Sequence, residues 1–178
     1  MVKTINLLAN YDPIGGAVNQ DPVSGVTFVG ALPIQTPVSP NGRNMVTANT
    51  LTGTITIVDP IMDTVVAMLP CDPGCHGVQY GAKQDGGYYA YVSSKFSNSL
   101  IVVDPDPNGD GNPVDATIAG RILLTSVGTT ATDDAITGNR GMGGQGILTI
   151  PVVYNGWVQN LPQIWKDQLT PAQRNPIQ

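Results

Sequence analysis

The chain has 178 residues, carries a formal net charge of −5 and is only 12% charged. Its basic residues form no cluster, which argues against nucleic acid or an anionic membrane surface as a partner. No stretch approaches the ~20 apolar residues of a membrane-spanning helix. All 13 acidic residues are Asp, and Gly (21) and Pro (15) are plentiful. Because these residues favour turns over helices, the composition predicts an all-β chain with many reversals.

Among the Asp-Pro steps of the chain, three that each follow a strand-like run recur at intervals of 47 and 45 residues: Asp12-Pro13, Asp59-Pro60 and Asp104-Pro105. Each step follows a strand-like run, at residues 8–11, 54–58 and 99–103 respectively. Asp suits the start of a turn because its carboxylate bonds N–H groups two residues on, and Pro presets φ of the next position. Spacing in this range predicts a stacked repeat whose unit is a small antiparallel sheet.

The second and third copies align without a gap, with Gly42 on Gly87 and Asp59 on Asp104. In each copy an earlier strand is expected, at 45–49 and 88–93, and a last strand at 64–69 and 116–124. The repeat fades after residue 124. There we expect a Gly-rich loop over 125–146, two further strands at 147–150 and 152–158, and a short helix starting near Thr170-Pro171. Trp157 and Trp165 are interpreted as core anchors, or as contacts with a neighbouring chain.

Four segments of the second copy read Ser39-Pro-Asn-Gly42, Met45-Val-Thr-Ala-Asn49, Gly53-Thr-Ile-Thr-Ile-Val-Asp59 and Asp63-Thr-Val-Val-Ala67. They resemble the YVTN-type β-propeller repeat, specifically across 37–80, more loosely over 81–124 and partly before 37. The resemblance implies four-stranded antiparallel blades, an exported or cell-surface setting and a binding or scaffolding role. Some relatives sit beside copper or haem redox modules.

We therefore expect a partial β-propeller of about three to four blades with a short irregular C-terminal tail, because closed propellers need roughly 4–8 blades. The predicted divisions are a partial first blade (1–36), a blade (37–80), a blade with a calcium-type loop (81–124), a Gly-rich loop with closing strands (125–159) and a tail (160–178). Because the first Asp-Pro turn comes only eleven residues after Met1, we expect the sequence to start within a blade. The remainder of a longer propeller, or another chain such as a second copy, would supply the missing strands.

The third Asp-Pro turn needs eleven residues where the second needs four, and it has calcium-ligand spacing. Oxygen-bearing side chains recur at positions 1, 3, 5, 7, 9 and 12 of the loop, with Gly109 at position 6 for the sharp turn. A non-metal alternative is a polar hairpin loop in which the Asp residues only cap turns. The predicted calcium ligands are Asp104, Asp106, Asn108, Asp110, Asn112 and Asp115.

A second cluster, Cys71-Asp-Pro-Gly-Cys75-His76, contains both cysteines and the single histidine. A Cys71–Cys75 disulfide is one interpretation and suits an exported protein. Two thiolates and an imidazole could instead hold copper or another soft metal. Haem is a third option, although its attachment signature is one residue shorter. The alternative for His76 is a structural place in a blade turn.

The function expected from these features is non-catalytic: an extracytoplasmic propeller module for binding, scaffolding or surface assembly, stabilised by calcium. The alternative is a propeller subunit of an extracytoplasmic copper- or haem-linked oxidoreductase. One histidine, no Glu and no Gly-x-Ser-x-Gly elbow offer no hydrolytic site. No signal peptide is visible at the start of the chain, so the periplasmic, secreted or surface setting is expected from the loop, the cysteines and the family resemblance.

Overall fold

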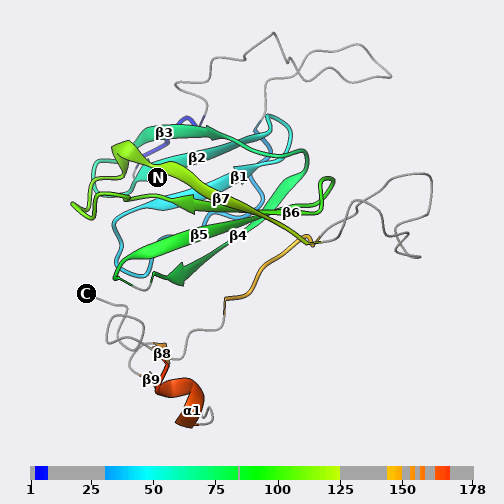
Figure 1. Cartoon of the computed structure of the whole chain (residues 1–178). Coiled ribbons are helices and arrows are strands. Elements are labelled where there is room, and N and C mark those ends of the chain that lie inside the picture. Colours follow the sequence, from blue (N-terminus) through cyan, green and yellow to red (C-terminus); the bar gives the residue numbers. More distant parts are fainter. Residues whose placement is uncertain are drawn as a thin grey trace, which may run out of the picture.

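A computed structural model describes residues 3–7, 31–83, 85–124, 144–149, 153–154, 157–158 and 163–168. Two antiparallel sheets dominate it, each with its strands in chain order (Figure 1). The first sheet contains β1 (Met45–Asn49), β2 (Thr54–Asp59) and β3 (Thr64–Pro70). The second contains β4 (Cys75–Ala82), β5 (Tyr88–Ser94), β6 (Ser99–Asp104) and β7 (Thr117–Leu123). The predicted all-β class is confirmed.

The remaining elements are short. A 3₁₀ turn, η1 (Pro113–Asp115), precedes β7, β8 (Val153–Tyr154) pairs with β9 (Trp157–Val158), and α1 spans Gln163–Lys166. The single strand expected over 152–158 is therefore a pair, and the intervening Asn-Gly is the residue pair that favours a two-residue hairpin. Residues 147–149 form no strand. No helix among the described residues is long and apolar enough to cross a membrane.

Several expected features lie outside the described residues. They are the strand at 8–11, the Asp12-Pro13 turn, most of the Gly-rich loop, residue 150, the helix start near Thr170-Pro171 and the side chains of the two tryptophans.

The backbone geometry confirms the 45-residue repeat between the two sheets. Gly42 and its equivalent Gly87 both take positive φ, at 72° and 74°. Gly53 and its equivalent Asn98 also share positive φ, at 61° and 51°, a conformation that Asn tolerates better than most residues. Register shifts fall at the same place, after Ile57 in β2 and between Val102 and Val103 in β6. Equivalent residues thus repeat turns and bulges as well as strands.

The strand that opens each repeat was missed by the sequence pattern. β4 begins inside the cysteine cluster and crosses the predicted division between residues 80 and 81. In the repeat that forms the first sheet, residues 31–38 run along β1, with bridges from Pro33 to Asn49 and from Val38 to Met45. Gly, Pro and single polar residues interrupt the alternation in both segments, so neither has a clear period of two. The first sheet therefore has three strands, with residues 31–38 bridged to its β1 edge at two points, and the second sheet has four strands.

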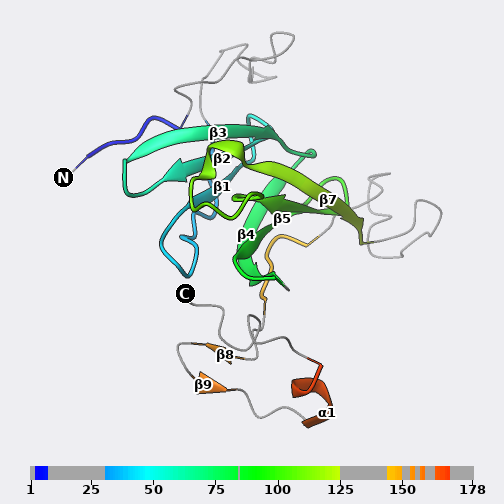
Figure 2. The same cartoon turned by 60° about the vertical axis from the view of Figure 1, so that its left-hand side comes forward.

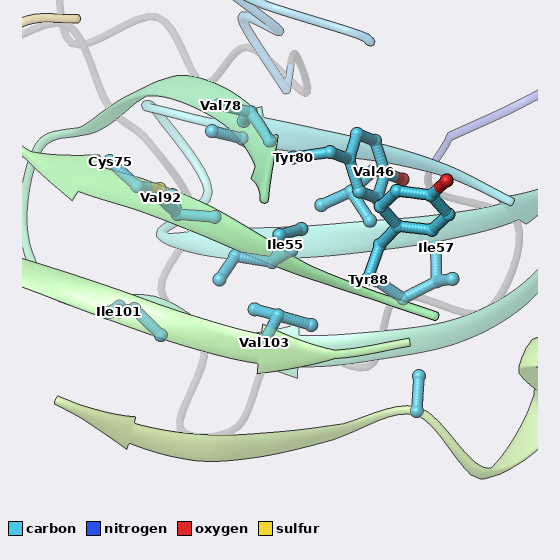
Figure 3. Packing of buried hydrophobic residues seen from close by; sticks show 13 residues of the cluster. Val46, Ile55, Ile57, Cys75, Val78, Tyr80, Tyr88, Val92, Ile101 and Val103 are labelled. Atoms are coloured by element: carbon cyan, nitrogen blue, oxygen red, sulfur yellow. The ribbon is translucent and has the colours of Figure 1, made fainter. Parts of the chain in front are cut away.

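One hydrophobic core lies between the two sheets (Figure 3). Alternate residues of β1 and β2 point to it from one side, and alternate residues of β4, β5 and β6 from the other, as the period of two requires. Its members are Val46, Ala48, Ile55, Ile57, Cys75, Val78, Tyr80, Tyr88, Ala90, Val92, Ile101, Val103 and Ala116.

The opposite face of the first sheet is buried as well, although it is polar. Thr47, Asn49 and Thr56 are fully buried, and the Asn49 amide donates to the hydroxyls of Thr54 (3.1 Å) and Thr56 (2.8 Å). Residues 3–7 lie beside β3 on this side of the molecule (Figure 2), and the Leu7 carbonyl accepts a bond from the Thr56 hydroxyl. The first sheet is therefore an inner layer.

Candidate functional site

The predicted calcium loop connects β6 to β7 and starts at a buried carboxylate. Asp104 ends β6, and one of its oxygens accepts the Asp106 N–H at 3.1 Å, as the Asp-Pro turn chemistry predicts. The same oxygen, Oδ1, lies 2.5 Å from the ammonium nitrogen of Lys83. Lys83 follows β4 and reaches the loop from the β4–β5 hairpin. A cation from another part of the sheet therefore sits at the first ligand position.

Further along the loop, the predicted ligand side chains cap backbone groups. Asp106 Oδ2 accepts the Gly111 N–H at 3.0 Å, and Asn108 accepts the Asp110 N–H at 2.9 Å. Asp110 accepts the Asn112 N–H at 2.7 Å, and the Asn112 side chain accepts the Val114 N–H at the start of η1. Gly109 has φ of +73°, the sharp turn expected at position 6. These bonds match the turn-capping alternative and order the loop without a ligand.

Two carboxylate oxygens in the loop lack a hydrogen-bond partner while being buried: Asp106 Oδ1 and Asp115 Oδ1. They belong to positions 3 and 12, where a calcium ion would take ligands, and an unpaired buried carboxylate oxygen is costly. Within the part of the chain that the structure describes, however, no three His, Cys, Asp or Glu side chains gather as a metal site. The donor set suits calcium chemically, but no three of its carboxylates gather at one point.

The loop fastens the second sheet to the first. Pro105 and Pro113, at its two ends, are fully buried, and η1 packs against β3 and β2. Buried prolines fix the loop ends without leaving an unsatisfied N–H group. The side of the loop that carries Pro107, Asn108, Gly109 and Asp110 is exposed. The expanded turn is therefore anchored at both ends and open to solvent at its tip.

Cys71 and Cys75 are free thiols that contact each other. Their hydrogen bond, together with burial, raises the pKa of Cys71 well above its ordinary value. The Cys75 thiol faces the core and donates to the carbonyl oxygens of Asn49 (3.3 Å) and Thr54 (3.6 Å). A thiol whose pKa is raised in this way, such as that of Cys71, is a poor nucleophile. The disulfide stays a prediction, and the contact between the thiols is compatible with it.

His76 lies apart from the thiols because neighbouring strand residues point to opposite faces of the sheet. Its Nδ1 atom is 2.7 Å from the carbonyl oxygen of Gln145. Beside it, a Cβ at Gly77 would meet the Gln145 oxygen at 2.6 Å, so the close approach of this segment requires glycine. The structure thus does not bring the three predicted soft-metal ligands together. It gives His76 a structural contact instead.

No protein-family model matches the sequence, and no curated protein matches it. Among solved structures, a chain of Kuenenia stuttgartiensis hydrazine synthase is similar over 48% of this chain, with 22% identity and a TM-score of 0.39. The matched part covers about a quarter (24%) of the length of the hydrazine synthase chain. The YVTN-type resemblance accordingly depends on the quoted motifs.

Sequence reasoning missed Lys83 and the partners of Asp72. Asp72 accepts the Ser99 hydroxyl at 2.6 Å and the Arg121 guanidinium at 3.1 Å, which ties the β3–β4 connection to β6 and β7. Neither contact has a fixed sequence spacing, because each depends on how the hairpins fold over one another. The only signal was the scarcity of basic residues, eight in the chain, beside several carboxylates.

Proposed function

We propose that the chain is a non-catalytic, extracytoplasmic β-propeller module for binding, scaffolding or surface assembly. The observation that carries this proposal is the repeat of one sheet on the next. The two sheets bury a shared apolar core between them, while the Cys75, His76 and Asp104 side chains bond to other parts of the fold. Such a stack builds surfaces rather than a reaction centre.

An available face of the second sheet supports the assembly role. In the first sheet, Val46, Ile55 and Ile57 are buried against the second sheet. Their repeat equivalents, Tyr91, Leu100 and Val102, lie on the outer face of the second sheet, opposite the core, and are only half-buried. Ile122 of β7, paired with Leu100, is 48% exposed. A face whose equivalent is covered by a sheet is suited to receive another sheet.

The partner proposed for this face is a β-sheet of another chain, and a second copy is the form to test first. Val102→Asp should leave the fold intact and reduce the mass measured by light scattering from that of an assembly to that of one chain. The matched change Ile57→Asp, at the equivalent buried position, should unfold the protein. A wild-type chain that remains monomeric at all concentrations would reject assembly between copies through this face.

Calcium stabilisation is a separate part of the proposal. It is supported by the ligand spacing, by the positive φ of Gly109 and by the two unpartnered carboxylate oxygens of Asp106 and Asp115. The ion would neutralise carboxylates that otherwise repel one another in the loop. The measurement is thermal melting with calcium and with EDTA, for the wild type and for an Asp104→Ala, Asp106→Ala variant. Equal effects of calcium on both proteins would reject the proposal.

The copper- or haem-linked alternative is favoured by no contact among the described residues. Its sharpest test is elemental analysis with a visible spectrum of the purified protein. Bound copper or a Soret band would replace the non-catalytic proposal.

A further inference from the structure

A lysine side chain from outside the expanded loop contacts the first residues of that loop. The Lys83 ammonium lies 2.5 Å from Asp104 Oδ1 and 3.0 Å from the backbone carbonyl oxygen of Asp106. It also lies 5.1 Å from the centre of the Tyr89 ring. The Lys83 and Asp104 side chains are only 14% and 12% exposed, so solvent screens this contact weakly.

These contacts resemble those of a bound cation. Carboxylate and carbonyl oxygens at alternate residues of one loop are the ligands that calcium takes from such a loop. Here two of them, on residues 104 and 106, converge on one ammonium group instead. The ammonium comes from the β4–β5 hairpin and is not part of the loop. Its contact with Asp104 is therefore separate from the hydrogen bonds that the loop side chains make to the loop backbone. The aromatic ring of Tyr89 adds a further favourable cation contact.

We propose that Lys83 is the resident cation of the 104–115 loop and competes with calcium for its inner oxygens. This inference rests on the calcium part of the proposed function, because it concerns the same loop. Two cations cannot share Asp104 Oδ1 at contact distance without strong mutual repulsion. Calcium binding through Asp104 therefore requires the Lys83 ammonium to withdraw. With Lys83 in place, the loop is ordered without a metal ion.

Another lysine, next to the turn between β2 and β3, provides a matched control. Lys3 lies 3.9 Å from Asp63, in the short turn between β2 and β3, and the two side chains are 49% and 43% exposed. An exposed pair at that separation contributes little to stability. Lys3→Met thus removes the same charge from the same protein without touching the expanded loop.

The experiment compares the wild type, Lys83→Met and Lys3→Met after treatment with a chelator. Melting temperature and calorimetric titration are measured with Ca²⁺, and with Mg²⁺ as a control ion. In chelator, Lys83→Met should melt below the other two proteins, since Asp104 loses its partner. Added Ca²⁺ should raise its melting temperature, with an affinity at least about tenfold tighter than that of the wild type. Lys83→Arg, which keeps the charge, should behave as the wild type does.

A Lys83→Met protein as stable in chelator as the wild type would show that Lys83 is not the loop's cation. A destabilised variant that Ca²⁺ does not bind more tightly would overturn the competition. If the wild type binds Ca²⁺ as tightly as the variant, the calcium proposal stands and this inference fails. If neither protein binds Ca²⁺, both fail. Should Lys83→Met not fold in chelator, its refolding yield with and without Ca²⁺ gives the same comparison.

Discussion

The turns after β2 and β6 start with the same Asp-Pro pair but differ in the contacts that the Asp makes. Asp59 accepts the N–H groups of Ile61 and Met62 and caps a short turn whose two apolar side chains are exposed. Asp104 also accepts an N–H group two residues on, but it is buried and paired with Lys83. In both turns the Asp carboxylate therefore accepts a backbone N–H group two residues on. A side chain from another hairpin, Lys83, is what brings Asp104 into a tertiary contact.

The same contrast holds for whole repeats. Equivalent strand positions have equivalent backbone conformations, yet Ile57 is buried between two sheets while Val102 is only half-buried. The repeated sequence therefore determines which face of its sheet a residue occupies. The position of the sheet in the stack determines how deeply that residue is buried, and so how much it contributes to stability.

The largest expected effect separates these two faces. Ile57→Ala should lower the free energy of unfolding by about 2–5 kcal/mol, because it leaves a cavity in the shared core. Val102→Ala should lower it by about 1 kcal/mol or less, since its methyl groups are half-buried. Urea unfolding of the two variants tests the difference. Equal losses would show that another layer covers the outer face in solution.

The two lysines sharpen the comparison of the turns. Lys83→Met should cost about 2–3 kcal/mol, below the full range for breaking a deeply buried pair because both side chains keep some exposure. Lys3→Met should cost less than about 1 kcal/mol. Denaturant unfolding at low and high salt provides the measurement. Only the effect of Lys3→Met should disappear at high salt, since the buried pair is poorly screened.

Alkaline pH probes the layer between the repeats through Tyr80. Burial raises the pKa of its phenol well above the ordinary value of about 10, and its hydroxyl bonds Asn44 Oδ1 at 2.7 Å. The folded chain then keeps a proton that the unfolded chain has lost. Stability is complete below about pH 10 and falls as the pH rises above it, by up to ~1.4 kcal/mol per unit from this group.

Tyr80→Phe isolates that contribution, because Cys71, Tyr88 and Tyr91, whose pKa values are also raised by burial, remain in the variant. Between pH 9 and 11 (about one unit on either side of the ordinary value), the free energy of unfolding should fall less steeply with pH for the variant than for the wild type. Identical slopes would place Tyr80 in contact with solvent.

The smallest effect tests the equivalence of Gly53 and Asn98. Gly53→Asn should change stability by only a few tenths of a kcal/mol, because Asn holds the same positive φ in the other repeat. Gly53→Ala should cost about 1 kcal/mol, since Ala gains nothing locally from that conformation. Thermal melts of the two variants distinguish these values. A large loss in the Asn variant would contradict the equivalence of the two turns.

Local patterns predicted most of the fold because strands and turns depend on near neighbours. β1 spans the expected residues 45–49, and β2, β3, β5 and β6 each begin where predicted and end one residue later. β7 is one residue shorter than expected at each end, and at its start Ala116 caps η1. β4 was not predicted, since its Gly-rich sequence lacks alternation. At the candidate site, the sequence identified the loop and its Gly109 turn, but not the contact with Lys83.

The sequence by itself determined an all-β repeat with capped Asp-Pro turns, because side chains act there on backbone groups a few residues away. The tertiary structure alone decided the contacts of the chemically active side chains. It separated His76 from the thiols, because alternate residues of a strand face opposite ways. It also brought Lys83 to Asp104, because pairing of adjacent hairpins joins residues that have no fixed spacing in the sequence.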